Sequence, residues 1–182
     1  MKEIFKEIAQ KREKLKKEWN RILPTNELLF DRWEKAKFAG AGEGTSIYDT
    51  CMILGDVKIG LNTWVGPYTL LDGSGGGLSI GDYCNISAGV HIYTHDSVRW
   101  SLSGGKIAIN KNPSSIGNCC YIAPMSIVSM GVTLGNHCVV AANSFVNKSF
   151  PDNSIIAGTP AKKIGKVVIN ENNEINLIYD KK

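Results

Sequence analysis

Two of the chain's three histidines lie in one short segment, HIYTHDS, at residues 91–97. Histidine is the side chain whose ordinary pKa lets it gain and lose a proton near neutral pH. A neutral imidazole within hydrogen-bond reach of a hydroxyl can remove its proton while the hydroxyl attacks an electrophile. His91 and His95 therefore raise the question of general-base catalysis. His137, the third histidine, follows Gly135-Asn136 and is predicted to be structural, at a corner of the fold.

An aliphatic residue returns at every sixth position on both sides of this segment. The ladder consists of Ile47, Ile53, Ile59, Val65 and Leu71, then Ile80, Ile86 and Ile92, then Ile116, Ile122, Val128, Leu134, Val140 and Val146. Neither an amphipathic helix nor an alternating strand has a period of six. A fixed internal period instead indicates a repeat architecture.

Small or compact residues occupy the fourth position after each ladder residue. Residues two apart on a strand share a face, so these positions also point inward. Four of the five cysteines stand there and are predicted to be small core residues: Cys51, Cys84, Cys120 and Cys138. Gly and Asn recur between the aliphatic positions, where sharp corners need them. The pattern predicts a solenoid of short parallel strands with three sides and about 18 residues per coil.

The ladder breaks off just after the two histidines. His91 precedes the ladder residue Ile92 and is interpreted as a structural strand residue. Beyond His95 the chain leaves the coil through about twenty residues and rejoins it at Ile116. Long loops in compact domains are often functional. We therefore expect His95 where a rigid wall meets a protruding loop, and we expect Asp96 to point away from it.

The most specific segment is SIGNCCYIAPMSIVSMGVTLGNHCVVAANSFVNKSFPDNSIIAGTPAKKIGKV, residues 115–167. It resembles the C-terminal half of sugar O-acetyltransferases of the galactoside and maltose acetyltransferase type. The whole six-residue repeat, about residues 45–165, resembles the left-handed β-helix acyltransferases. The resemblance implies a mainly β fold, a left-handed parallel β-helix, and an acetyl-CoA-dependent enzyme that forms a homotrimer. His95 matches the family's catalytic histidine, the general base.

The resemblance also implies binding residues. For the acceptor, the matching position is Asp72. Apart from the resemblance, the aromatic side chains of Trp100 and Tyr121 are expected to offer flat surfaces for a sugar ring or for the pantetheine arm. For acetyl-CoA, the matching positions are Ala123, Ala142, Asn147, Lys148, Thr159, Lys162 and Lys163. The family places an oxyanion-stabilising N–H just after the position of Ala123, where this chain has Pro124. Proline has no N–H to donate, so the oxyanion donor is open.

The segments outside the ladder are predicted to close its ends. Residues 1–40 are expected to be a helical segment, with an apolar stripe along residues 3–22. Residues 41–165 are expected to form the β-helix, with a protruding loop at 96–115. Residues 166–182 are expected to form a hairpin and tail, because apolar and polar residues alternate there around an Asn-Asn turn. The whole formal charge of +4 falls in residues 1–40. A basic helix is usually a solvated face, so no nucleic-acid partner is expected, and contact with a membrane-bound glycan stays open.

The localisation is predicted from two kinds of segment that the sequence does not resemble, a membrane-spanning helix and a signal peptide. No apolar run approaches the length of a membrane-spanning helix. The N-terminal residues alternate charge with Ile and Phe, unlike the core of a signal peptide. A cytoplasmic protein is therefore expected, with its cysteines reduced.

The predicted function is transfer of an acetyl group from acetyl-CoA to a hydroxyl of a sugar or glycan. One alternative is N-acetylation of a nucleotide-linked amino sugar, and another, of a different class, is a non-catalytic β-helix that binds or scaffolds. The γ-class carbonic anhydrases resemble this fold and bind zinc through three histidines. The three histidines here do not match that spacing, so no metal is expected.

Overall fold

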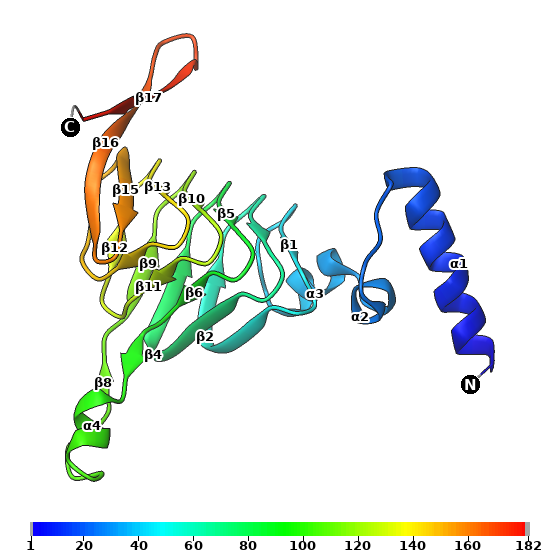
Figure 1. Ribbon diagram of the computed structural model, residues 1–182, viewed down its shortest axis with the longest axis horizontal. Coiled ribbons are helices and arrows are strands. Elements are labelled where there is room, and N and C mark those ends of the chain that lie inside the picture. Colours follow the sequence, from blue (N-terminus) through cyan, green and yellow to red (C-terminus); the bar gives the residue numbers. More distant parts are fainter. Residues whose placement is uncertain (1, 181–182) are drawn as a thin grey trace.

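The computed structural model describes residues 2–180 as a helical arm, a solenoid of short parallel strands and a terminal hairpin (Figure 1). The mainly β fold expected from the six-residue repeat, a hexapeptide-repeat parallel β-helix with an N-terminal helical segment and a C-terminal hairpin, is confirmed. The division into three segments with the bounds given above stays a prediction.

One wall of the solenoid is a sheet with the strand order β1-β3-β5-β10-β13-β15, extended by the antiparallel strands β16 and β17. Its strands are β1 (Ser46–Ile47), β3 (Trp64–Val65), β5 (Asn85–Ile86), β10 (Tyr121–Ile122), β13 (Val139–Val140), β15 (Ser154–Gly158), β16 (Ala161–Ile169) and β17 (Ile175–Tyr179). The last two strands form the expected hairpin.

A second, bent sheet forms the other two walls. In one wall, the first half of β2 pairs with the first half of β4, followed by β6, β11 and β14. In the other wall, the second half of β2 pairs with the second half of β4, followed by β9 and β12. The strands are β2 (Met52–Ile59), β4 (Leu70–Ile80), β6 (His91–Ile92), β9 (Ser114–Ile116), β11 (Ile127–Val128), β12 (Thr133–Leu134) and β14 (Phe145–Val146).

The core is the aliphatic ladder, stacked coil upon coil. On the wall that contains β6, the register aligns Ile53, Leu71, Ile92, Val128 and Val146. The last four of these side chains are fully buried. Each buried side chain of this size contributes about 1.5–3 kcal/mol relative to an exposed one. The period of six therefore sets which side chains meet inside the solenoid.

A second internal ladder consists of hydroxyl and thiol side chains that share one register: Thr45, Thr63, Cys84, Cys120, Cys138 and Ser154. Each donates a hydrogen bond to a backbone carbonyl at a corner of the solenoid. Cys84 Sγ, for example, lies 3.1 Å from the carbonyl oxygen of Gly117, and Thr63 Oγ1 lies 2.9 Å from that of Gly81. The predicted burial of Cys51, Cys84, Cys120 and Cys138 is confirmed, while Cys119 is exposed.

Three helices precede the solenoid. They are α1 (Lys2–Trp19), α2 (Thr25–Leu29) and α3 (Arg32–Phe38). Asp31 caps α3 by accepting from the backbone N–H groups of Trp33 and Glu34, and Ala36 packs into the open end of the core. No helix in residues 2–180 is long and apolar enough to cross a membrane.

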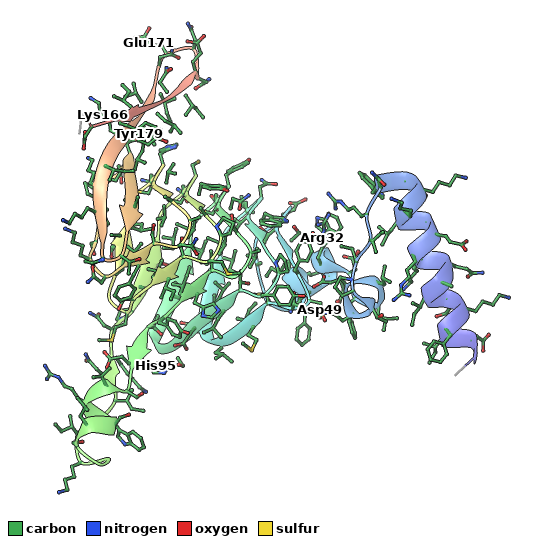
Figure 2. The ribbon with its side chains drawn as sticks, in the orientation of Figure 1. Arg32, Asp49, His95, Lys166, Glu171 and Tyr179 are labelled. Atoms are coloured by element: carbon green, nitrogen blue, oxygen red, sulfur yellow. The ribbon has the colours of Figure 1, made fainter. Side chains whose placement is uncertain are left out.

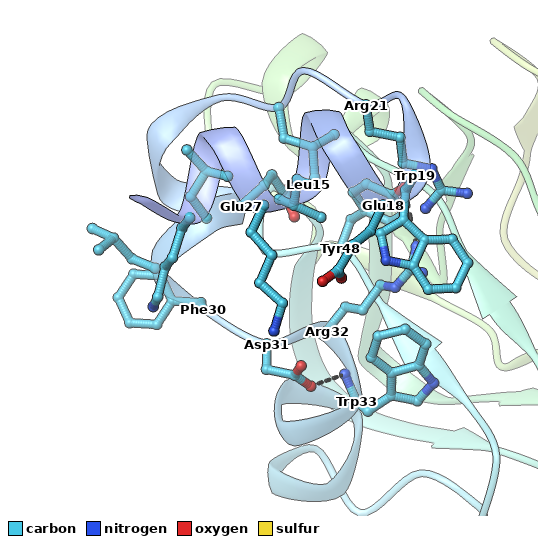
Figure 3. A pocket seen from close by; sticks show the side chains of 15 residues that line it. Leu15, Glu18, Trp19, Arg21, Glu27, Phe30, Asp31, Arg32, Trp33 and Tyr48 are labelled. Atoms are coloured by element: carbon cyan, nitrogen blue, oxygen red, sulfur yellow. Dashed lines mark hydrogen bonds between the residues drawn. The ribbon is translucent and has the colours of Figure 1, made fainter. Parts of the chain in front are cut away.

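The first helix stands away from the solenoid (Figure 1). A cavity of about 630 Å³ separates α1 from α2 and the start of α3, and the half-exposed indoles of Trp19 and Trp33 lie on its lining (Figure 3). The expected apolar stripe of α1 is therefore covered only in part: Ile8 is buried, whereas Trp19 is 65% exposed.

Candidate active site

Two segments distant in sequence end at the same edge of the solenoid. Leu71 on β4 pairs with Ile92 on β6. Asp72 follows the first of these ladder residues, and His95 lies three residues after the second. His95 begins β7 (His95–Asp96), which pairs with β8 (Asn110–Lys111) and carries α4 (Val98–Leu102) between them. This is the protruding loop expected from the sequence, and it projects from the lower left of the solenoid (Figure 1).

The structure brings His95 and Asp72 into contact. His95 Nδ1 lies 2.6 Å from Asp72 Oδ2. The carboxylate is 1% exposed, whereas the imidazole is 36% exposed and faces out at the base of the protruding loop (Figure 2). Apart from this contact, Asp72 Oδ2 has no hydrogen-bond partner among the described residues. The contact is thus a close electrostatic one, with Nδ1 directed at the carboxylate.

Ser74 holds the other carboxylate oxygen. Its backbone N–H and its hydroxyl both donate to Asp72 Oδ1, at 3.0 and 2.5 Å. Its Oγ also lies 3.3 Å from His95 Nδ1. Thr94 fastens the same corner, because its Oγ1 donates to the carbonyl of Asp72 at 2.7 Å and accepts from the N–H of Gly75 at 2.8 Å.

Ser74 reaches this position through an insertion in the repeat. Gly55 on β2 pairs with Gly73 on β4, and the next pair is Val57 with Leu78. One residue separates these positions on β2 and four separate them on β4, so β4 carries three extra residues. The backbone there is closely packed: a Cβ on Gly73 would collide with the carbonyl of Asp56, and one on Gly75 with the carbonyl of Thr94. The glycines let the insertion lie between the coils on either side.

Hydrogen bonds outweigh burial in setting the charge of Asp72. Burial raises the pKa of this carboxyl. The side-chain and backbone hydrogen bonds from Ser74, together with the charge of His95, lower the pKa by more than burial raises it, so the pKa lies below its usual value. The group behind His95 is therefore an ionised carboxylate at neutral pH.

The geometry bears on the acceptor residues expected from the resemblance. Asp72 has no oxygen open to solvent, so an acceptor on this face would meet His95 first. Trp100 lies on α4 and is 47% exposed, on the loop that begins at His95. Tyr121 is exposed on β10, which belongs to the other sheet, between Asn85 and Val139. The structure therefore brings Asp72 to His95 and leaves Tyr121 on a different wall.

The positions of two other residues named from the sequence can be described. The side chain of Asp96 accepts from the backbone N–H of Val98 at 3.0 Å. His137 sits at a corner with a left-handed φ of 56°. Ser74 and Thr94 were not among the expected site residues. The available signal for Ser74 was the spacing of nine residues from Leu71 to Ile80, in a ladder whose other steps, apart from the protruding loop, are six.

The residues expected to bind acetyl-CoA lie on two different edges of the solenoid. Ala123 and Ala142 follow β10 and β13 at the corner that leads into β11 and β14, and Thr159 closes that corner by donating to the carbonyl of Asn143 at 3.1 Å. Lys162 and Lys163 are exposed on β16, beside this corner. Asn147 and Lys148 follow β14 at the opposite edge, in line with His95.

Comparisons with known proteins agree with the fold. No family model matches the chain. Protein CapG of Staphylococcus aureus is 41% identical over 107 residues, which cover 58% of this chain and 62% of that protein. The galactoside O-acetyltransferase of Escherichia coli is 30% identical over 98 residues, 50% of this chain and 48% of that enzyme. These matches thus span less than two thirds of either relative, and the second confirms the resemblance to sugar O-acetyltransferases.

A solved structure gives a similar result. AntD, an N-acyltransferase from Bacillus cereus in complex with dTDP and 3-hydroxybutyryl-CoA, superposes with a TM-score of 0.63 and 28% sequence identity. The superposition covers 69% of this chain and 71% of AntD.

Among residues 2–180, no group of three or more His, Cys, Asp or Glu side chains is arranged to hold a metal ion.

Proposed function

We propose that the chain is an acyltransferase that moves an acetyl group from acetyl-CoA to a hydroxyl of a sugar or glycan. The observation that carries the proposal is the pair formed by partly exposed His95 and buried Asp72 at the base of the protruding loop. The likeness to a galactoside O-acetyltransferase supports the class of acceptor and donor. A cytoplasmic location belongs to the same proposal.

In the proposed reaction, His95 acts as the general base. Its Nδ1 faces Asp72, which leaves Nε2 for the acceptor. Nε2 takes the hydroxyl proton as the oxygen attacks the thioester carbonyl. The resulting tetrahedral intermediate then collapses, its C–S bond breaks, and the CoA sulfur leaves with the proton held by His95. Ionised Asp72 stabilises the imidazolium that exists between these steps. Asp72 is thus proposed as a positioning residue behind His95 rather than as a ligand of the acceptor.

The proposed acetyl-CoA residues need two copies of the chain to form one site. Ala123, Ala142, Thr159, Lys162 and Lys163 lie at one end of the short strands β11 and β14, and His95 lies at the other end of this wall. A neighbouring copy that set its small-residue corner against this edge would unite them. This supports the homotrimer implied by the resemblance, with Trp100 over the acceptor and the lysines at the phosphates.

A backbone N–H for the oxyanion is proposed at Ala142. Pro124 has no N–H, and its carbonyl accepts from the N–H of Asn143 at 3.1 Å. Ala142 stands one coil further at the equivalent corner position, and its N–H has no hydrogen-bond partner among the described residues. A free N–H directed at the developing negative charge is the kind of donor that stabilises it.

Likeness to AntD favours a second candidate, N-acylation of a nucleotide-linked amino sugar. An amine is a better nucleophile than a hydroxyl and needs less help from a base. The two candidates therefore differ in the acceptor that responds and in how far the rate depends on His95.

The testing experiment measures release of free CoA thiol from acetyl-CoA with pooled sugars, oligosaccharides or nucleotide-linked amino sugars. His95→Gln is compared with the control His137→Gln, which changes a histidine at a corner. A hydroxyl acceptor should respond in the unaltered protein, and His95→Gln should lower its rate by about a hundredfold or more while His137→Gln changes it little.

Other outcomes identify the alternatives. A response confined to amino sugars, with a small loss in His95→Gln, indicates N-acylation. If no pool responds and calorimetry detects no binding of CoA, the enzyme proposal is rejected in favour of a non-catalytic binding or scaffold protein.

A further inference from the structure

The insertion in β4 places one more polar side chain on the catalytic pair than general-base chemistry requires. We propose that Ser74 is a positioning residue that fixes the tautomer of His95 with its proton on Nδ1, and that the insertion exists to hold it there. The proposal rests on the proposed function, since it assigns Ser74 a part in preparing His95 as the base.

The hydrogen-bond inventory of Ser74 sets the direction of each contact. A serine hydroxyl has one hydrogen and two lone pairs. The 2.5 Å contact is to a carboxylate oxygen of Asp72, which can only accept, so the hydrogen lies there. A lone pair of Oγ is then the part of the hydroxyl that His95 Nδ1 meets at 3.3 Å.

Two acceptors consequently converge on one imidazole nitrogen. Nδ1 faces Oδ2 of Asp72 at 2.6 Å and Oγ of Ser74 at 3.3 Å. An unprotonated Nδ1 would set its own lone pair against both. The arrangement therefore favours the tautomer with hydrogen on Nδ1, and this tautomer leaves Nε2 as the free base.

Ser74 also sets the rotamer of the carboxylate. Its N–H and hydroxyl both bind Oδ1, which leaves Oδ2 directed at the imidazole. These hydrogen bonds are the main influence that lowers the pKa of Asp72 against its burial. The hydroxyl of Ser74 thus acts on His95 twice, directly as an acceptor and indirectly through the orientation and charge of Asp72.

The backbone of the insertion makes this placement rigid. Ser74 is itself exposed, but Gly73 and Gly75 on either side of it are buried. Each glycine touches the backbone of an adjacent coil, and the N–H of Gly75 is bonded to Thr94, directly before His95. The backbone that carries Ser74 is therefore bonded, through Thr94, to the backbone that carries His95, although the two residues belong to different coils.

The test reads the tautomer directly, by ¹⁵N NMR of the full chain labelled in histidine. The chain has three histidines, and His95→Gln identifies the signals of His95. The unaltered protein at a pH where His95 is neutral should show hydrogen on Nδ1. Ser74→Ala should give a mixture of both tautomers, and Ser74→Thr, which keeps the hydroxyl, should restore the original spectrum.

Turnover provides a second readout with a matched control. Ser74→Ala should lower kcat about tenfold, the rate equivalent of roughly one hydrogen bond, with little change in the KM for acetyl-CoA. Ser79→Ala changes an exposed serine on the same strand that has no bond to the pair, and it should alter neither kcat nor the spectrum.

An unchanged tautomer in Ser74→Ala, or an equal change in Ser79→Ala, would overturn the proposal. The spectrum needs no substrate, so the two proposals can fail separately. A Ser74-dependent tautomer in a protein that transfers no acetyl group would reject the proposed function alone. Turnover with a Ser74-independent tautomer would reject the role of Ser74 alone.

Discussion

The coils formed by residues 116–146 and those formed by residues 70–95 use the same repeat in different ways. In the later coils the ladder steps by six without interruption, and every corner is short. In the earlier coils the chain is interrupted twice, after the paired residues Leu71 and Ile92. The interruptions are the insertion that holds Ser74 and the loop that begins at His95.

The difference shows how a uniform repeat acquires a local site. Stacked coils of equal length place like residues above one another and give every corner a similar environment. Two interruptions at neighbouring corners of the same edge bring together residues that the repeat alone would keep apart. Asp72, Ser74 and His95 meet there, while the uninterrupted coils supply the rigid wall behind them.

The largest effect should come from making the interrupted coil regular. Deletion of Gly75–Gly77 shortens the step from Leu71 to Ile80 to that of the other coils. We expect a folded solenoid that retains its far-ultraviolet circular dichroism, with acetyl transfer reduced at least a hundredfold because Ser74 and Thr94 lose their clamp on the pair. Retention of most activity in this variant would show that the insertion is dispensable.

A smaller effect on activity is expected from Asp72→Asn. The amide keeps the size of the side chain but removes the charge that stabilises the imidazolium, so kcat should fall about 10- to 100-fold. Measured beside the deletion, this variant separates the contribution of the carboxylate from that of the insertion.

The same substitution should change how stability depends on pH. The folded state lowers the pKa of Asp72, so its contribution to stability is complete above the usual pKa of a carboxyl and is lost as the pH falls through the lowered value. Denaturant unfolding of Asp72→Asn should therefore show a weaker loss of stability in acid than the unaltered chain. An identical acid slope in both proteins would contradict this.

The smallest effect concerns a regular corner. Cys119 is exposed and has a left-handed φ of 57°, a conformation that asparagine tolerates better than cysteine. Cys119→Asn should raise the free energy of unfolding by about 0.5 kcal/mol and leave acetyl transfer unchanged. Cys119→Ala is the control and should give no gain. A loss of stability in the asparagine variant would mean that the thiol contributes something the corner geometry does not reveal.

Much of the fold could be predicted from the sequence because the repeat fixes it locally. The period of six identifies the inward residues, and the position four later identifies the buried cysteines such as Cys120. The hairpin formed by β16 and β17 follows from alternation around an Asn-Asn turn. The arrangement of α1 could not be predicted, because an amphipathic pattern does not say what its apolar face will meet.

The site could be predicted only in part for a similar reason. His95 stands out because it is a histidine at the end of the ladder, and the structure finds it there. The contact with Asp72 depends on the lateral pairing of Leu71 with Ile92, which the spacing alone does not reveal across an interrupted ladder. Ser74 depends further on the path of a glycine-rich insertion, whose backbone choices are too many to settle from residue types.

The insertion also has a genetic consequence. It adds three residues to β4 without altering the pairing on either side, so its gain or loss corresponds to one in-frame change of three codons. Such an event leaves every buried ladder residue encoded as before. Three codons therefore suffice to convert a regular step of the solenoid into the interrupted one, or the reverse.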